Sequence, residues 1–492
     1  MHTGGAMKKK EIDESLYDAV LYLHVLHTCG ATQYAAVQSL AENAAVFGAA
    51  AEAFRSVITD AEFCGTTLYE GLIRLSKTTP SEKLSRFAAG YAASVRTAGT
   101  AFPFLDDAVD TLRIEAETAE KKYQESLAVM GEMYLTLFVA APLFAVIAGL
   151  VLAMIAGLNP FYLELILYLL FPAAAAAFLL VLDSMQRKER YRPLTLPPDF
   201  SPTGKRDGDG AEANEFARLK RYDRKEKLRS VVKDPIGFFT KNPETTLFAG
   251  LPAGFLLSCV IPNPALQAGA FLLSAGIPFA VFFERKQKHQ RKAAQALPDF
   301  FRVLGSAVSR GMTTAEAVSL ASTEAGALQK DLVRTASAIH LGELADHALF
   351  GMANCLRISH ANRAVILIAE SSRFSADISP VLFELADNQR RLQTADATRR
   401  SGMSLYTAVI YLAFFVYLFV AGILLTVFLD AAGASGTLDA GLYERVLLTG
   451  SLVHAVCSGF AAGKMGEGMM GAGVKHVCVM TAVWVIFAMV CG

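Results

Sequence analysis

The feature that most constrains the fold is an uncharged apolar run at residues 135–157, LTLFVAAPLFAVIAGLVLAMIAG. A helix rises about 1.5 Å per residue and the hydrocarbon core of a bilayer is about 30 Å thick, so this run is long enough to cross it. A second run, residues 161–182, follows after a short turn and carries one acidic residue, Glu164. The two runs predict a hairpin of membrane-spanning helices. The hydrophobic content of 53% and mean hydropathy of +0.36 agree with an integral membrane protein.

Further apolar runs bring the expected number of membrane spans to about seven. A second hairpin comprises residues 246–262 and 264–283, and its first arm is short and interrupted by Pro252. Such an arm requires local thinning of the bilayer or shielding by neighbouring helices. The remaining expected spans are residues 404–429, 446–463 and 476–490.

The distribution of basic residues predicts the orientation, because Lys and Arg near span ends are retained in the cytoplasm. The turns at residues 158–159 and 263 carry no charge, and residues 430–444 contain acidic residues but no Lys or Arg. We therefore expect a cytoplasmic N-terminus, an external C-terminus and a multi-pass protein of the cell membrane. The basic clusters that support this orientation are Lys121 and Lys122; Arg187, Lys188, Arg190 and Arg192; Arg285, Lys286, Lys288, Arg291 and Lys292; and Arg399 and Arg400.

These assignments predict an all-α protein with two cytoplasmic helical bundles linked by transmembrane helices. The expected parts are a first bundle (1–132), a transmembrane hairpin (133–182), a cytoplasmic linker with a basic helix (183–245), a second hairpin (246–283), a second bundle (284–403) and three transmembrane helices (404–492). The linker contains RPLTLPPDFSPTGKRDGDGAEANE, which is rich in Pro, Gly and Asp and is typical of a flexible segment. The basic helix after it is suited to anionic membrane lipids or to a partner protein.

The two expected bundles are related by an internal duplication. Each combines Ala-rich helical periodicity with Gly or Pro at the breaks and runs into a strong membrane span. The repeated positions keep their order, and one four-residue insertion reconciles two offsets. At an offset of 281, Gly30, Thr32, Ala36 and Val37 correspond to Gly311, Thr313, Ala317 and Val318; at 277, Gly65, Arg96, Pro103 and Leu105 correspond to Gly342, Arg373, Pro380 and Leu382.

Motifs for catalysis or cofactor binding lack the context that would make them work. GEGMMG, residues 466–471, matches a dinucleotide fingerprint but follows no strand, and GFAAGK, residues 459–464, is too short for a phosphate-binding loop and precedes Met465 instead of Ser or Thr. His24, His27 and Cys29 are too few for a structural metal site, and seven scattered cysteines suggest no disulfide framework. We expect a non-enzymatic protein with no cofactor, no metal and no nucleic-acid partner.

Two ionisable residues lie in the predicted membrane segments. Glu164 is near the outer end of its span, and His454 lies within the span at 446–463. Such residues usually face a bundle interior or a wet cavity. A local hydrogen bond between helices is the favoured interpretation, and an ion pathway is the alternative.

The stretch ALPDFFRVLGSAVSRGMTTAEAVSLAS, which ends at Ser322, begins the second bundle. Leu297, Phe301, Leu304 and Val308 form one apolar stripe, and Gly311 ends the helix. This stretch resembles the start of the F domain of type II secretion systems, with a Leu-Pro-Asp helix, an Arg-Gly turn and an Ala-rich second helix. Residues 367–415 resemble the closing half of that domain, which has a helix with paired Arg and a final helix that enters the membrane. The first bundle keeps the closing half, residues 97–127, but lacks the Leu-Pro-Asp opening.

Tandem F domains separated by membrane hairpins resemble the platform proteins of the archaellum, of archaeal type IV pili and of tight-adherence pili. The resemblance implies an assembly platform that couples a hexameric secretion ATPase to pilin-like or archaellin-like subunits. A homodimer is also expected, because symmetric membrane platforms are commonly dimeric. The residues expected to face the ATPase are the basic ones on the bundle surfaces: Arg302, Arg310, Arg373, Arg390, Arg391, Arg399, Arg400, Lys121 and Lys122.

Two other functions remain open on the sequence alone. A small-molecule or ion transporter or channel is compatible with several spans, Pro-broken helices and Glu164. Transporter repeats, however, duplicate the membrane spans, whereas here the clearest repeat lies in the soluble bundles. A membrane-anchored signalling scaffold is the third hypothesis. The kind of filament, whether archaellum, adhesive pilus or pseudopilus, is not specified by the sequence.

Overall fold

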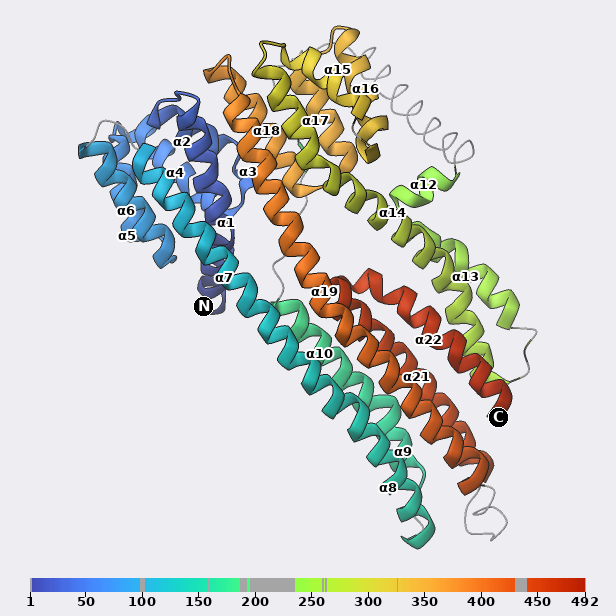
Figure 1. Cartoon of the computed structure of the whole chain (residues 1–492). Coiled ribbons are helices and arrows are strands. Elements are labelled where there is room, and N and C mark those ends of the chain that lie inside the picture. The colour runs from blue at the N-terminus through green and yellow to red at the C-terminus, as the bar shows by residue number, and fades with distance from the viewer. Residues whose placement is uncertain are drawn as a thin grey trace, which may run out of the picture. The chain divides into compact units, whose positions relative to one another are not determined.

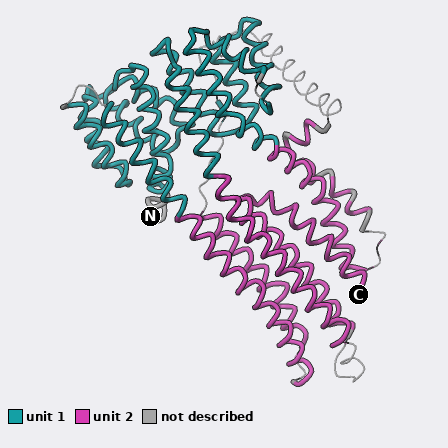
Figure 2. The backbone as a smooth tube through the Cα atoms, in the orientation of Figure 1, with its two compact units in different colours: residues 1–121, 187–204, 289–395 teal, residues 122–186, 205–288, 396–492 magenta. Residues whose placement is uncertain are grey.

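The computed structural model describes residues 2–97, 102–156, 159–185, 193–194, 235–258, 261, 263–324, 326–429 and 440–491. All regular secondary structure in these ranges is helical, and the order of the helices is labelled in Figure 1. The chain divides into two compact units, coloured separately in Figure 2. Unit 1 comprises residues 1–121, 187–204 and 289–395, and unit 2 comprises residues 122–186, 205–288 and 396–492.

The first set of helices in unit 1 is punctuated by glycines with left-handed backbone. Gly30 (φ 82°) and Gly65 (φ 67°) follow the helix ends, where a side chain would be strained. The Thr32 side chain accepts a hydrogen bond from the Ala35 N–H and so starts the next helix. The helices of this set are α1 (His2–Thr28), α2 (Gln33–Glu42), α3 (Ala44–Phe47), α4 (Ala49–Cys64), α5 (Leu68–Thr78), α6 (Glu82–Thr97) and α7 (Phe102–Leu135).

The second set of helices in unit 1 has left-handed glycines at the corresponding places, Gly311 (φ 86°) and Gly342 (φ 99°). Thr313 starts the helix after Gly311 through a capping box with Glu316. The predicted stripe of Leu297, Phe301, Leu304 and Val308 is buried, which confirms that prediction. The helices of this set are α14 (Pro264–Val308), α15 (Thr314–Glu324), the 3₁₀ turn η4 (Gly326–Leu328), α16 (Gln329–His340), α17 (Ala345–Leu356), α18 (Ser359–Phe374) and α19 (Ser379–Ile423).

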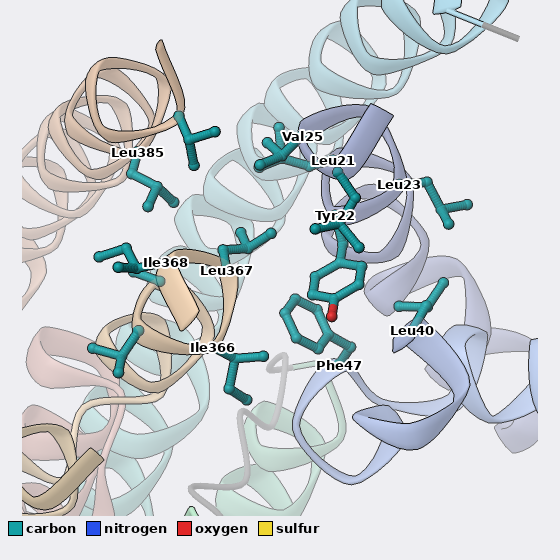
Figure 3. Packing of buried hydrophobic residues seen from close by; sticks show 14 of the residues in the cluster. Leu21, Tyr22, Leu23, Val25, Leu40, Phe47, Ile366, Leu367, Ile368 and Leu385 are labelled. Atoms are coloured by element: carbon teal, nitrogen blue, oxygen red, sulfur yellow. The ribbon is translucent and has the colours of Figure 1, made fainter. Parts of the chain in front are cut away.

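The two sets share one hydrophobic core. Leu21, Tyr22 and Phe47 of the first set lie in the same cluster as Leu367 and Leu385 of the second. Figure 3 shows these side chains approaching one another from the two sets. Burying large side chains of this kind contributes about 1.5–3 kcal/mol each, so the shared core is a main source of stability for unit 1.

Unit 2 contains the apolar helices, three of which include a single π-helical turn. The helices are α8 (Ala141–Ala156), α9 (Phe161–Leu165), α10 (Phe171–Met185), α12 (Pro235–Lys241), α13 (Glu244–Ser258), α21 (Ala440–Glu467) and α22 (Met470–Cys491), together with parts of α7, α14 and α19. The π turns are η1 (Thr136–Ala140), η2 (Ile166–Leu170) and η5 (Leu424–Phe428). Each π turn interrupts the regular ladder without ending the helix, so the apolar run continues through it.

Six helical segments among the described residues are long and apolar enough to cross a membrane: Phe102–Ile155, Phe161–Met185, Pro264–Val308, Ser379–Phe428, Gly441–Glu467 and Met470–Cys491. The chain is therefore a multi-pass membrane protein. The seventh expected span is not among them, because α13 has only 15 residues. Its rise of about 22 Å is less than the thickness of the hydrocarbon core. Gly250 nevertheless lets α13 approach α14 closely, since a Cβ there would lie 2.9 Å from the Ala275 Cα.

Most of the expected linker and basic helix at 183–245 lies outside the described residues. One described residue from this stretch, Leu194, contacts α17. Its backbone N–H donates to the Asn354 Oδ1 at 2.7 Å, and the Asn354 Nδ2 donates to the Leu194 carbonyl at 2.9 Å. Leu194 is buried, so this point of the linker is anchored on the second set of helices.

Candidate functional site

A polar contact joins the two sets of helices within unit 1. The Arg363 guanidinium of α18 lies 3.5 Å from the Asp18 carboxylate of α1, and both side chains are only about 15% exposed. The Tyr17 hydroxyl donates a hydrogen bond to the Asn388 Oδ1 at 3.2 Å. Burial raises the pKa of Tyr17 to about 12, so this hydroxyl keeps its proton at neutral pH. The contact is partly desolvated, which strengthens the attraction between the charges.

A small pocket lies beside this contact. Leu21 and Phe47 of the first set line it together with Leu367, Leu385 and Leu392 of the second, and the Asp18–Arg363 pair lies at the same place. Because Arg363 already faces a carboxylate, the pocket offers no uncompensated charge to a ligand. The arrangement acts as a joint between the two sets of helices.

Two turns expose apolar side chains that the sequence did not single out. Phe63 precedes the turn at Gly65 and is 83% exposed, and Leu341 precedes the turn at Gly342 and is 89% exposed. Leu344, just after the second turn, is also exposed. Single exposed apolar side chains are ordinary on protein surfaces. Phe63 and Leu341 are noted because they lie at equivalent turns of the two sets. We call the turns at Gly65 and Gly342 the glycine turns.

Two predicted basic residues, Arg302 of α14 and Arg310 of the turn after it, lie on the surface and make contacts within the second set. Arg302 Nη2 lies 3.2 Å from the Asp387 Oδ1 of α19. Arg310, in the turn that follows α14, donates through Nη2 to the Ser306 Oγ of α14 at 2.7 Å. Exposed pairs of this kind contribute at most about 1 kcal/mol, so their side chains can be recruited by a partner at small cost.

The basic residues of α18 and α19 are paired within their own helices. Arg373 contacts Glu370 at 3.2 Å, and Arg391 contacts Glu384 at 3.3 Å. Further along α19, Arg399 and Arg400 both contact Asp396, at 2.9 and 2.8 Å. The side chains of Arg390, Lys121 and Lys122 are exposed. The nine predicted residues thus come from α7, α14 and the turn after it, α18 and α19.

The sequence matches the family described as Type II secretion system (T2SS), protein F, over residues 19–149 and 300–426, together more than half of the chain. The chain belongs to this family. The family resemblance of the sequence is thereby confirmed. An uncharacterized protein of Methanocaldococcus jannaschii is 22% identical over 97% of this chain and 79% of its own length. No solved structure matches the chain.

The two segments that match the family correspond to the two sets of helices. They begin 281 residues apart and end 277 residues apart, the two offsets at which the sequence repeats. Each segment continues past the helices of unit 1 into an apolar helix, α8 in the first case and the end of α19 in the second. The last two helices, α21 and α22, lie beyond both matched segments.

The helices α21 and α22 form a close-packed hairpin in unit 2. Gly463 lies against Gly473, so that a Cβ on Gly463 would lie 2.1 Å from the Gly473 Cα. A Cβ on Gly459 would likewise lie only 2.5 Å from the Val477 N. The Trp484 Nε1–H donates to the Ser451 Oγ at 2.7 Å and is fully buried. Small residues at this spacing permit close backbone contact between membrane helices.

Ion pairs lie near the turn that joins α21 and α22. Lys464 Nζ lies 2.7 Å from the Asp183 Oδ1 of α10, and Lys464 is buried. Lys475 Nζ lies 3.0 Å from the Glu284 Oε2 of α14 and also contacts Glu467. The GFAAGK motif thus contributes a lysine that joins two helices of unit 2. Sequence inspection missed this pairing because Asp183 is distant in the chain.

His454 is buried in unit 2 among aromatic rings. Its ring stacks on Tyr417 with centroids 4.2 Å apart, and its Nε2 lies 3.4 Å from the Ser458 Oγ of the same helix. The Tyr134 hydroxyl donates to that Ser458 Oγ at 3.0 Å. The contact of His454 with other helices is therefore ring stacking, and its hydrogen bond stays within α21. Glu164 lies in the short helix α9 and is half-buried.

The histidines near Gly30 have separate partners. His24 lies 3.4 Å from the Asp106 carboxylate, and His27 Nε2 lies 3.1 Å from the Tyr91 hydroxyl. Burial lowers the pKa of His27, so its ring is neutral at pH 7. Within the part of the chain that the structure describes, no three His, Cys, Asp or Glu side chains gather in a way that could hold a metal ion.

Proposed function

We propose that this chain is a non-enzymatic membrane platform that couples a cytoplasmic hexameric secretion ATPase to the assembly of pilin-like or archaellin-like subunits. The observation that carries the proposal is the double match to the protein F family, with each match running from soluble helices into an apolar helix. Tandem cytoplasmic F domains fused to membrane helices would pass displacement from an ATPase across the bilayer as rigid elements.

The ATPase would dock on the glycine turns, assisted by the basic surface residues. Phe63 and Leu341 offer apolar anchors at equivalent places in the two sets of helices. Desolvated apolar anchors supply most of the affinity at a protein interface, whereas rim charges mainly accelerate and orient association. Arg310 and Arg390 are exposed on the second set and would provide such charges.

The proposed topology places the N-terminus and unit 1 in the cytoplasm and the C-terminus outside. The basic residues near the span ends support this orientation. An external C-terminus requires α13 to span the bilayer as a seventh helix. Its close contact with α14 at Gly250 would shield it from lipid, and local thinning would accommodate its length.

Two measurements test the platform function. The full-length protein, purified in detergent, should retain the secretion ATPase produced from the same genome in a pull-down. Deletion of its gene should abolish filaments or secretion and leave the pilin-like subunits in the membrane. Normal filaments in the deletion strain, together with no recovery of the ATPase, would contradict the proposal.

A transporter is the second candidate, because Lys464 is a buried charge paired with Asp183 between helices of unit 2. Ionisable residues inside membrane bundles often mark an ion pathway. Lys464 lies in the last turn of its helix, however, which suits an anchor at the membrane border. Substrate-dependent flux in proteoliposomes that contain this protein alone, abolished by Lys464→Met, would favour the transporter.

A further inference from the structure

The two sets of helices in unit 1 contact each other through different faces. The first set contributes α1 and α3, through Asp18 and Phe47, and the second set contributes α18 and α19, through Arg363 and Asn388. Figure 3 shows the first set's Leu21 and Phe47 approaching the second set's Leu367 and Leu385. If the two sets were packed about a two-fold axis, each would use the same face. Here the interface is heterologous, so each set keeps one unused face.

The unused faces repeat the charge pair of the interface. At the offset of 281, Asp18 of α1 corresponds to Asp299 of α14, and at the offset of 277, Arg363 of α18 corresponds to Arg86 of α6. Asp299 and Arg86 are both exposed, and neither has an ion-pair partner among the residues that the structure describes. The acidic half of the contact is therefore still available on the second set, and the basic half on the first set.

A second pair of positions is also complementary. Leu21 and Leu392 line the pocket at the interface, and their counterparts are Arg302 on the second set and Glu115 on the first. Arg302 and Glu115 carry opposite charges. Each is partly exposed and forms an ion pair within its own set, Arg302 with Asp387 and Glu115 with Lys83. On the unused faces, the oppositely charged Arg302 and Glu115 therefore stand where the interface has the apolar Leu21 and Leu392. A more polar face of this kind suits association between molecules that also exist apart.

We propose that a second copy of this chain docks on these faces, so that Asp299 of each chain pairs with Arg86 of the other. The two chains then form a closed arrangement in which four sets of helices repeat one heterologous contact. Both sets continue into membrane helices, through α7 and α19, which confines the association to the membrane plane. The proposal names the surfaces of the expected homodimer and depends on neither the ATPase nor the pilins.

Charge reversal with mixing of variants tests the pairing. Full-length chains carrying two different tags are reconstituted in lipid nanodiscs, and co-purification is measured for wild type, Arg86→Asp, Asp299→Arg and a mixture of the two variants. Each variant alone places like charges at both contacts and should self-associate roughly tenfold or more weakly than wild type. In the mixture, one contact is native and the other is reversed, so association between the two variants should recover.

The controls separate misfolding from loss of the contact. Arg334→Asp reverses an exposed charge on α16, outside both faces, and should leave self-association unchanged. Recovery in the mixture also shows that both variants are folded, which circular dichroism of each confirms. A monomeric wild type would overturn the proposal. So would full self-association of either single variant, or a mixture that stays apart while both variants keep the wild-type spectrum. A pull-down of the ATPase by these variants is scored separately.

Discussion

The Asp18 carboxylate and the Arg363 guanidinium lie 3.5 Å apart and join the two sets of helices of unit 1. We expect Asp18→Ala to lower the free energy of unfolding by about 1–3 kcal/mol, because it leaves a mostly buried arginine without this partner. Replacing both residues by Ala should cost less than the sum of the Asp18→Ala and Arg363→Ala costs. Unfolding in detergent micelles, followed by circular dichroism, measures the two single variants and the double variant. Strictly additive effects would show that the two side chains are not coupled.

The glycine turns should carry affinity for the ATPase. Phe63→Ser combined with Leu341→Ser removes two apolar anchors, and we expect at least a roughly tenfold weaker complex, since a central anchor contributes more than about 1 kcal/mol. Ile114→Ser is the matched control, because Ile114 is also exposed, at 59%, but lies along α7. Affinity is measured by titrating labelled ATPase onto the protein in nanodiscs. Equal losses in the control would point to a general effect of surface hydrophobicity.

The hairpin of α21 and α22 should not tolerate a side chain at Gly463. A Cβ there overlaps the backbone of Gly473, so Gly463→Ala should force the helices apart and cost about 1–3 kcal/mol. Gly402 of α19 is a helical glycine with no atom within 4 Å of a built Cβ. Gly402→Ala should be neutral or slightly stabilising, because alanine has the higher helix propensity. Thermal unfolding in micelles compares the two variants, and equal midpoints would be inconsistent with close packing at Gly463.

The side of the membrane on which the chain ends reports whether α13 spans it. If α13 crosses as a seventh helix, a reporter fused after Gly492 lies outside, and a periplasmic or extracellular phosphatase fusion is active. If only the six long helices cross, the C-terminus shares the side of the N-terminus and a fluorescent-protein fusion is active in its place. We expect the external location, with reporters fused before Met1 cytoplasmic as the control.

The capping box at the start of α15 should give a small pH dependence of stability. The Thr313 N–H donates to the Glu316 carboxylate at 2.9 Å, and this hydrogen bond, followed by that from the Thr313 hydroxyl, lowers the pKa of Glu316. A lowered folded-state pKa means that the stabilisation is present above the unfolded value of 4.5 and is lost as the pH falls through the folded value. Glu316→Ala should therefore lower the unfolding midpoint at pH 7 and make little difference near pH 3. A difference that grows on acidification would contradict the role of the carboxylate.

Much of the fold could be predicted because it depends on neighbouring residues. The buried stripe of α14, the left-handed turns at Gly311 and Gly342 and the apolar helices all follow from local periodicity and backbone preference. The continuity of α14 and α19, each 45 residues long, did not follow. A change from amphipathic to uniformly apolar sequence resembles a boundary, whereas the backbone hydrogen bonds continue through it.

The sequence by itself determined the helical class, six of the expected membrane spans, the repeat at offsets of 281 and 277 and the membership of the protein F family. Only the tertiary structure decided which charges meet. The sequence contains Asp18 and Asp299, and Arg86 and Arg363, as equivalent residues, yet one pair is formed and the other pair stays exposed. The physical reason is that helix formation depends on residues within a few turns, whereas an ion pair requires two distant surfaces to be packed together, and that packing uses only one face of each set.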